Sequence, residues 1–183
     1  HIVRMTWSRH PQAASVDVQA KFDDGARLLA KDDDTLVANP TDPQDDVPTY
    51  LEFLVIAAKN SVFPWPWATT TYNHVIGDSK IHELLTNQLA NVKLVSTILR
   101  FIDGEWKQCA GVSEPPLPSI LCEAPALDGI TLVHEYGHLA GLNDRTNHAH
   151  AIMYSPHNSQ SNEVNCDESA QYKSYTPAFW NGD

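Results

Sequence analysis

The segment HEYGHLAGLND, residues 134–144, carries the pattern from which the fold and the site of this chain can be predicted. His134 and His138 are four residues apart, so on a helix their side chains lie on one face, one turn apart. Two imidazole nitrogens at this spacing can bind a single zinc ion. Glu135 is rotated by about 100° from His134 and therefore lies beside that face. The spacing predicts a helical metal site with a carboxylate next to it.

The third ligand of this site has three candidates. Gly141 can adopt a left-handed conformation, which ends the helix and lets the chain turn back toward the ion. This turn would bring Asp144 to the metal, and a carboxylate oxygen binds zinc at about 2.0–2.2 Å. His148 and His150, further along in NHAHAIMY, are the alternatives if the turn is wide. We expect Asp144 to be the ligand.

The composition is that of a globular protein with an acidic surface. The 183 residues include 42% hydrophobic and 19% charged residues, which fits one folded domain. The 12 lysines and arginines against 23 aspartates and glutamates give a net charge of −11, which disfavours binding to nucleic acid. The apolar run at 51–58 is too short to span a membrane.

The rest of the chain predicts a mixture of strands and helices. We expect strands at 2–9, 50–58, 93–102 and 119–124, a turn at 103–108, and helices at 15–31, 80–92 and 128–141. No internal repeat or linker marks a second domain. The chain is therefore predicted to form a single domain over residues 1–183.

Two loops carry weaker signals. The acidic stretch 32–48 is predicted to be a solvated surface loop, with a structural Ca²⁺ ion as the alternative, because its aspartates lack the spacing of a calcium loop. Trp65 and Trp67 lie in the proline-containing stretch 63–72. They either pack over an edge of the core or line a substrate cleft.

A second histidine–glutamate pair occurs in the expected helix 80–92. His82 and Glu83 begin another HExx pattern, but Thr86 takes the place of the second histidine. A histidine beside a glutamate on an amphipathic helix is ordinary, so we expect no chemistry from this pair.

The three cysteines contain no CxxC pair, which argues against a cysteine-based zinc knuckle or a thioredoxin-like site. In an exported protein, Cys109 and Cys122 could form a disulfide across the loop GVSEPPLP, or Cys166 could pair with either of them. The sequence leaves this pairing open. Because the chain begins at His1 and not at a methionine, we expect a processed, secreted form.

The motif HExxHxxGxx(H/D) resembles the zinc motif of the metzincin clan of metallopeptidases, and the form that ends in Asp is similar to that of snapalysin-type members. AIMYSP, residues 151–156, resembles the Met-turn of this clan in the form that matrixins carry. The resemblance implies that Met153 lies beneath the metal without binding it. The close similarity covers residues 128–156, and further upstream only the coarse order of elements agrees.

The resemblance implies an α+β fold of the metzincin-like zincin type. Its parts would be a twisted, mostly parallel sheet with an antiparallel edge strand, a backing helix and an active-site helix. Residues 1–141 would form the N-terminal subdomain of one catalytic domain. Residues 142–183 would form a small C-terminal subdomain with the Met-turn and a helix at 162–175.

The implied function is that of a secreted, zinc-dependent endopeptidase. One catalytic Zn²⁺ would be bound by His134, His138 and Asp144, and Glu135 would act as general base and then as general acid. An extended peptide would add to a sheet strand, for which we expect residues 119–124.

The remaining implications concern the substrate pocket and the partners. Tyr154 and His157 are candidates for the substrate pocket. The expected partners are a protein or peptide substrate and a pro-segment or inhibitor, and the chain is expected to be a monomer. Two alternative functions are a non-catalytic zinc-binding or adhesion module and a zinc hydrolase of non-peptide amides. Glu135 argues against the first alternative, because such a module has no use for a base.

Overall fold

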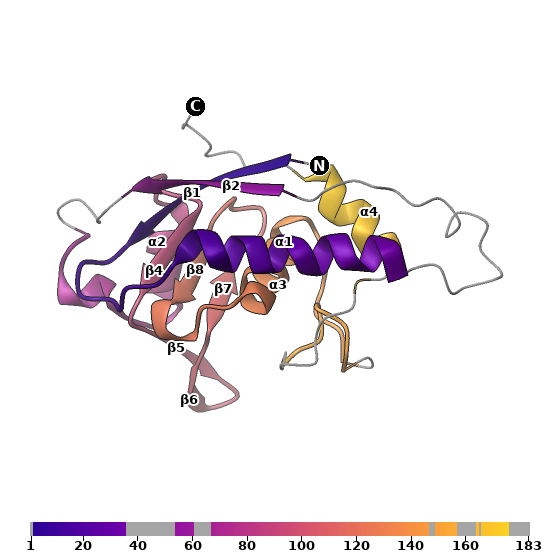
Figure 1. Ribbon diagram of the computed structural model, residues 1–183. Helices are drawn as coiled ribbons and strands as arrows, with labels where there is room; N and C mark the ends of the chain where they lie inside the picture. The colour runs from indigo at the N-terminus through magenta and orange to yellow at the C-terminus, as the bar shows by residue number, and fades with distance from the viewer. Residues whose placement is uncertain are drawn as a thin grey trace.

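The computed structural model describes residues 2–35, 54–60, 67–146, 149–156, 164 and 166–175. Within these residues the chain forms two β-sheets and several helices, so the predicted α+β class is confirmed (Figure 1). The strands are β1 (Ile2–Arg9), β2 (Leu54–Asn60), β3 (His74–Ile76), β4 (Val92–Val95), β5 (Thr97–Ile102), β6 (Glu105–Gln108), β7 (Gly111–Ser113) and β8 (Ile120–Glu123). The α-helices are α1 (Val18–Thr35), α2 (Asp78–Thr86), α3 (Gly129–Leu139) and α4 (Cys166–Ser174), and short 3-10 helices span Thr70–Tyr72 and Ala124–Ala126. None of the described helices is long and apolar enough to cross a membrane.

Several predicted elements fall on residues that the structure does not describe. The acidic stretch expected to be a loop begins inside α1, which continues to Thr35, and its remainder from 36 onward lies outside the described residues. The calcium alternative therefore concerns residues outside the described part of the chain. The same is true of Trp65, His148 and His157.

The larger sheet has five strands in the order β2-β1-β4-β8-β7. The first four are parallel to one another, and β7 pairs antiparallel with β8 at one edge. The strand expected at 119–124 is β8, which is hydrogen-bonded on both sides, by β4 and by β7. Our prediction that this strand receives a peptide is wrong, because it has no free edge. The edge next to β8 is β7, which lies in the segment expected to be a proline loop, and the opposite edge is β2.

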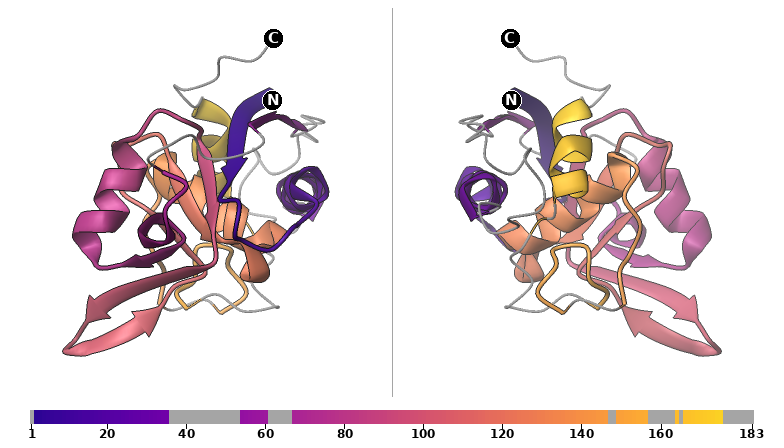
Figure 2. Two further views of the ribbon diagram at one scale, coloured as in Figure 1. Left: turned by 90° about the vertical axis from the view of Figure 1, so that its left-hand side faces the viewer. Right: turned by 90° about the vertical axis from the view of Figure 1, so that its right-hand side faces the viewer.

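The run 93–102, expected to be one strand, is divided between two sheets. Asn73 accepts hydrogen bonds from the backbone N–H groups of Ser96 and Thr97 at 3.0 and 3.1 Å, which interrupts the strand after β4. β5 then joins the smaller sheet, of order β3-β5-β6. The expected turn at 103–108 is limited to Asp103 and Gly104, whose φ angles of 53° and 80° close a tight hairpin. Figure 2 shows this β5–β6 hairpin extending away from the rest of the molecule.

Helices cover both faces of the larger sheet (Figure 2). Side chains of α1 and α3 pack on one face with alternate residues of β1, β4 and β8, and α2 packs on the other. Helices α1 and α3 cross at two glycines. A Cβ on Gly25 would lie 2.7 Å from Cγ2 of Val133, and a Cβ on Gly129 would lie 2.7 Å from the backbone nitrogen of Gly25. This close crossing fixes the start of α3, where Asp128 caps the helix by accepting the N–H of Thr131 at 2.7 Å.

A lysine is buried within the larger sheet. Lys93, in β4, is fully buried, and its Nζ donates to the carbonyl of Ala90 at 2.7 Å and contacts Oγ of Ser119 at 2.8 Å. Among the described residues no carboxylate forms an ion pair with it. Burial lowers the pKa of Lys93 to about 7.

Lys93→Met should therefore stabilise the protein and reduce the dependence of its stability on pH. In the unfolded chain a lysine keeps a pKa of roughly 10.4, so between pH 7 and 10 the unfolded state binds more protons than the folded state. The free energy of unfolding of the wild type should rise by roughly 2–3 kcal/mol from pH 7 to pH 9 through this group, and its contribution should level off below pH 7. Urea unfolding at these pH values measures the effect. The exposed Lys107 provides the control, since Lys107→Met should keep the wild-type dependence of the unfolding free energy on pH. The same dependence in Lys93→Met would show that Lys93 is not its source.

Candidate metal centre

Helix α3 and the turn that follows it bring three polar side chains together. Oδ1 of Asp144 lies 3.2 Å from Nε2 of His134 and 3.3 Å from Nε2 of His138. The ligand atoms of this group all lie within 4.8 Å of one another, so the group could hold a metal ion. Two ligands at 2.0–2.1 Å from a tetrahedral ion are about 3.3 Å apart. The observed separations of 3.2 and 3.3 Å fit that arrangement.

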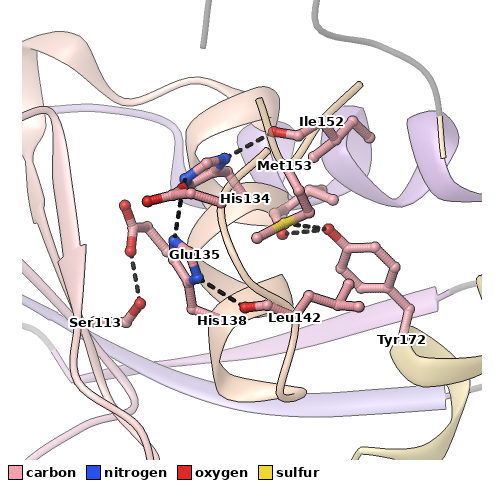
Figure 3. Close-up of polar contacts among 10 residues, drawn as sticks. Ser113, His134, Glu135, His138, Leu142, Ile152, Met153 and Tyr172 are labelled. Carbon is pink, nitrogen blue, oxygen red and sulfur yellow. Dashed lines mark hydrogen bonds and ion pairs between the residues drawn. The ribbon is translucent and has the colours of Figure 1, made fainter. Parts of the chain in front are cut away.

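The two histidine rings are held in the orientation that a metal ligand needs (Figure 3). Nδ1 of His134 lies 2.7 Å from the carbonyl oxygen of Ile152, and Nδ1 of His138 lies 2.9 Å from that of Leu142. A carbonyl oxygen only accepts, so each Nδ1 carries the proton. In the neutral ring the lone pair is then on Nε2, which faces Asp144. Such backbone partners fix both the tautomer and the angle of a ligating ring.

Gly141 has the role that the sequence predicts. Its φ is 95°, in the left-handed region, and its N–H donates to the carbonyl of His138 at 2.9 Å. The next N–H, of Leu142, donates to the carbonyl of Gly137 at 2.9 Å. These bonds end α3 and turn the chain back, so that the carbonyl of Leu142 reaches the His138 ring and Asp144 reaches both histidines. The alternative ligand His150 is exposed and is not part of the group.

The residue beneath the site is Met153, which is fully buried. Its Sδ lies 3.2 Å from the hydroxyl of Tyr172, and this hydroxyl also contacts the carbonyl of Val133 in α3 at 3.1 Å (Figure 3). Gly137 provides the space for both side chains, because a Cβ at this position would lie 2.6 Å from the Tyr172 hydroxyl and would overlap the sulfur of Met153. The contact joins α3, the turn at 151–154 and α4.

Gly137→Ala should destabilise the protein by about 1–2 kcal/mol, although alanine is the better helix former. The added methyl group would displace Met153 and Tyr172, since neither can move away without disturbing the core. Thermal unfolding measures the loss. Tyr172→Phe removes one of the two clashing groups, so the substitution should cost less in that background. A Gly137→Ala variant as stable as the wild type would contradict this packing.

Contacts of Arg145, which include an ion pair, also hold the turn at 151–154. The backbone N–H of Arg145 donates to the carbonyl of Met153 at 2.6 Å, and the N–H of Ser155 donates to the carbonyl of Arg145 at 2.9 Å. The guanidinium of Arg145 pairs with the buried carboxylate of Glu168 in α4. Helix α4 therefore helps to hold the loop that presents the Ile152 carbonyl to His134. The sequence provided no periodic signal for this pair.

Glu135 lies under the edge strand β7. Its side chain is buried, and Oε2 accepts a hydrogen bond from Oγ of Ser113 at 2.6 Å (Figure 3). Gly111 leaves room for the carboxylate, because a Cβ there would lie 2.8 Å from Cγ of Glu135. Burial raises the pKa of Glu135, and the hydrogen bond from Ser113 opposes that shift. Sequence reasoning missed Ser113 and Gly111, because the strand that holds them was not predicted.

The group opens onto a cleft of about 700 Å³. Its walls are β7, α3, the turn after α3 and one face of the β5–β6 hairpin. Ser155 and Pro156 line the cleft on the side of the Met153 turn, whereas Tyr154, which we expected in the substrate pocket, is half-buried and is not among the lining residues. Trp67 packs beside the α2 core and is also not among them.

The cysteines in the described part of the chain are not paired. Cys109 is half-buried beside the cleft and Cys122 is buried in β8, and both are free. The disulfide between these two, one of the pairings weighed from the sequence, is absent. The side chain of Cys166 lies outside the described part of the structure.

The second histidine–glutamate pair forms ordinary surface contacts. Nδ1 of His82 lies 2.8 Å from a carboxylate oxygen of Glu114, and Glu83 accepts from Tyr72 and Lys80. Among the described residues, neither His82 nor Glu83 belongs to the group that could hold a metal ion.

No known family model matches this chain. No curated protein is significantly similar to it in sequence. The geometry of the site is therefore the evidence for its chemistry.

Proposed function

We propose that this protein is a zinc-dependent endopeptidase of the metzincin type. One observation carries the proposal: a buried carboxylate, Glu135, lies directly between a His134–His138–Asp144 group and the free edge of a β-sheet. A metal-binding module would need only the His134–His138–Asp144 group. A peptidase also needs the carboxylate and the free edge.

The donor set favours zinc. Two neutral imidazoles and one carboxylate form a ligand set found in catalytic zinc sites, and their separation of 3.2–3.3 Å suits a small tetrahedral ion. Bound there, zinc would polarise the scissile carbonyl and stabilise the oxyanion that develops on it.

Glu135 would move the protons. Its carboxylate would accept a proton from the attacking water and deliver it to the leaving amine. Burial raises the pKa of Glu135. A carboxyl group whose pKa lies closer to the working pH can more readily both accept a proton from water and donate it to the leaving amine. Ser113 would hold the carboxylate in place by donating to Oε2, which leaves Oε1 for the reacting water.

The free edge of β7 would bind the peptide. An edge strand presents unpaired N–H and C=O groups, with which an extended chain can form a ladder. β7 pairs only with β8 among the described strands, and it lines the cleft over Glu135. We infer that the substrate runs antiparallel to β7. This edge favours an extended peptide over a small non-peptide amide, which cannot form such a ladder.

The metzincin assignment has further support in the arrangement of elements. The mostly parallel sheet with its antiparallel edge, the backing helix α1, and Met153 beneath the histidines are the features that the resemblance implies. On the basis of the same resemblance, we also propose that the protein is secreted, monomeric and regulated by a pro-segment or an inhibitor.

Product analysis distinguishes this function from its two alternatives. The zinc-loaded protein is incubated with denatured casein and, separately, with small N-acylated amides, and new amino termini are identified by mass spectrometry. We expect internal cleavage of casein and no turnover of the small amides. Turnover of the amides alone would indicate a non-peptide hydrolase, and no turnover of either by a zinc-loaded protein would indicate a binding module.

A further inference from the structure

Among the described residues that line the cleft of this acidic protein, one side chain apart from the histidines is basic. Among the described residues that line it, Arg100 is the single lysine or arginine, in a chain whose net charge is −11. Its guanidinium contacts Asp78 through Nε at 3.0 Å, and the Asp78 carboxylate is largely exposed, at 62%. An arginine has five N–H donors, and this contact occupies one of its three nitrogens. The terminal nitrogens of Arg100 can therefore bind a second carboxylate.

The alternation of β5 directs Arg100 to the cleft. Arg100 and Ile102 line the cleft, whereas Phe101 between them is 56% exposed and packs against Trp106. In the antiparallel ladder Arg100 pairs with Lys107, whose side chain is not among those that line the cleft. The hairpin thus presents one of its two cations to the site.

The position of the hairpin along the chain indicates which part of a substrate Arg100 would meet. The hairpin leads directly into β7, since the N–H of Cys109 donates to the carbonyl of Ile98 at 3.0 Å and β7 begins at Gly111. Arg100 therefore lies toward the N-terminal end of β7. A peptide that runs antiparallel to β7 has its C-terminal residues at that end.

We infer that Arg100 selects substrates with a carboxylate on the C-terminal side of the bond that is cleaved. This inference rests on the proposed peptidase function. The carboxylate could belong to an aspartate or glutamate side chain or to the C-terminus of a short peptide, and a guanidinium binds either one through paired N–H groups. In a protein this acidic, a single arginine in the cleft also reduces the repulsion that such a substrate would meet.

Charge-matched peptides test the inference. A peptide cleaved by the wild type is made with Glu or Gln at each position around the cleaved bond, and with a free acid or an amide at its C-terminus. One position on the C-terminal side should favour the acid by about tenfold in kcat/KM, mainly through KM. Arg100→Gln should remove this preference. Arg100→Glu should reverse it, so that Lys at the same position becomes preferred over Glu.

Lys107→Gln is the matched control for Arg100→Gln, because it removes one positive charge from the same hairpin at a side chain that does not line the cleft, and it adds no carboxylate beside Arg100, its partner in the ladder. It should keep the wild-type preference. Zinc content and thermal unfolding are measured for each variant, and Arg100→Gln provides the result if Arg100→Glu does not fold. Cleavage by the wild type with no preference for an acidic residue would overturn the inference about Arg100. Equal preferences in the Arg100 and Lys107 variants would do the same. Both results would leave the proposed peptidase function intact. No cleavage of any peptide by the zinc-loaded wild type would instead contradict the proposed function on which it depends.

Discussion

Glu135→Gln should abolish peptide hydrolysis and leave zinc binding intact. The substitution keeps the size of the side chain, and an amide can still accept the hydrogen bond from Ser113, which is 2.6 Å long in the wild type. The amide cannot take a proton from water. General acid–base catalysis contributes about 10²–10⁴-fold, and one residue that performs both proton transfers should account for at least this loss in kcat. Initial rates on one identified peptide, at equal zinc content, measure the effect.

Glu83→Gln is the control for this experiment. Glu83 also follows a histidine on a helix, but it binds Tyr72 and Lys80 at the surface and does not line the cleft. Its substitution should leave kcat unchanged. A Glu135→Gln variant that retains zinc and hydrolyses the peptide at a rate near that of the wild type would show that another group is the base.

Asp144→Ala should remove most of the affinity for zinc. Its Oδ1 lies within 3.3 Å of Nε2 of both His134 and His138, so it completes a set that two histidines alone do not provide. Loss of an outer partner of a ligand typically costs 10–100-fold in metal affinity, and we expect loss of the ligand itself to exceed roughly 100-fold. Hydrolysis should disappear with the metal. Competition with a chromophoric chelator measures the affinity.

Glu114→Gln is the corresponding control, because Glu114 is a carboxylate that also contacts a histidine, His82, and lies outside the metal-binding group. The zinc affinity of the Glu114→Gln variant should equal that of the wild type. An unchanged affinity in Asp144→Ala would indicate that His148 or His150, the alternatives from the sequence, supplies the third ligand.

The metal-binding group could be predicted from the sequence because its geometry is local. Helical spacing places His134 and His138 on one face, and the positive φ of Gly141 returns the chain so that Asp144 meets them. Everything needed for this prediction lies within residues 134–144. The backbone partners of the rings, at Ile152 and Leu142, follow from the same turn and its continuation.

The edge strand β7, to which we propose that the substrate binds, could not be predicted, because strand order depends on contacts between distant residues. β7 has three residues, GVS, and its pattern is too short to distinguish it from the proline loop that follows. β8 has the stronger apolar signal because it is buried between two neighbours, and this is also why it cannot receive a peptide. Ser113 and Gly111 were missed for the same reason.

The division of residues 93–102 between two strands illustrates a second limit of prediction from the sequence. Its β-branched residues favour a single strand, and the interruption comes from Asn73, which lies more than twenty residues away. This contact lies at the point where the chain leaves β4 and enters β5, whose hairpin with β6 carries Arg100 to the cleft. The sequence pattern therefore gave no sign of the basic residue that we propose to select substrates, although it predicted the His134–His138–Asp144 group that could hold a metal ion.

We propose that zinc at His134, His138 and Asp144 enables the Glu135 carboxylate to hydrolyse peptides. A titration of activity with zinc examines this dependence on the metal. The metal is removed with a chelator, the apo-protein is titrated with zinc, and the initial rate on the identified peptide is followed. We predict a rate that rises in proportion to added zinc and stops rising at one equivalent per chain. A protein that binds one equivalent of zinc and cleaves no peptide at any point of the titration would contradict the claim.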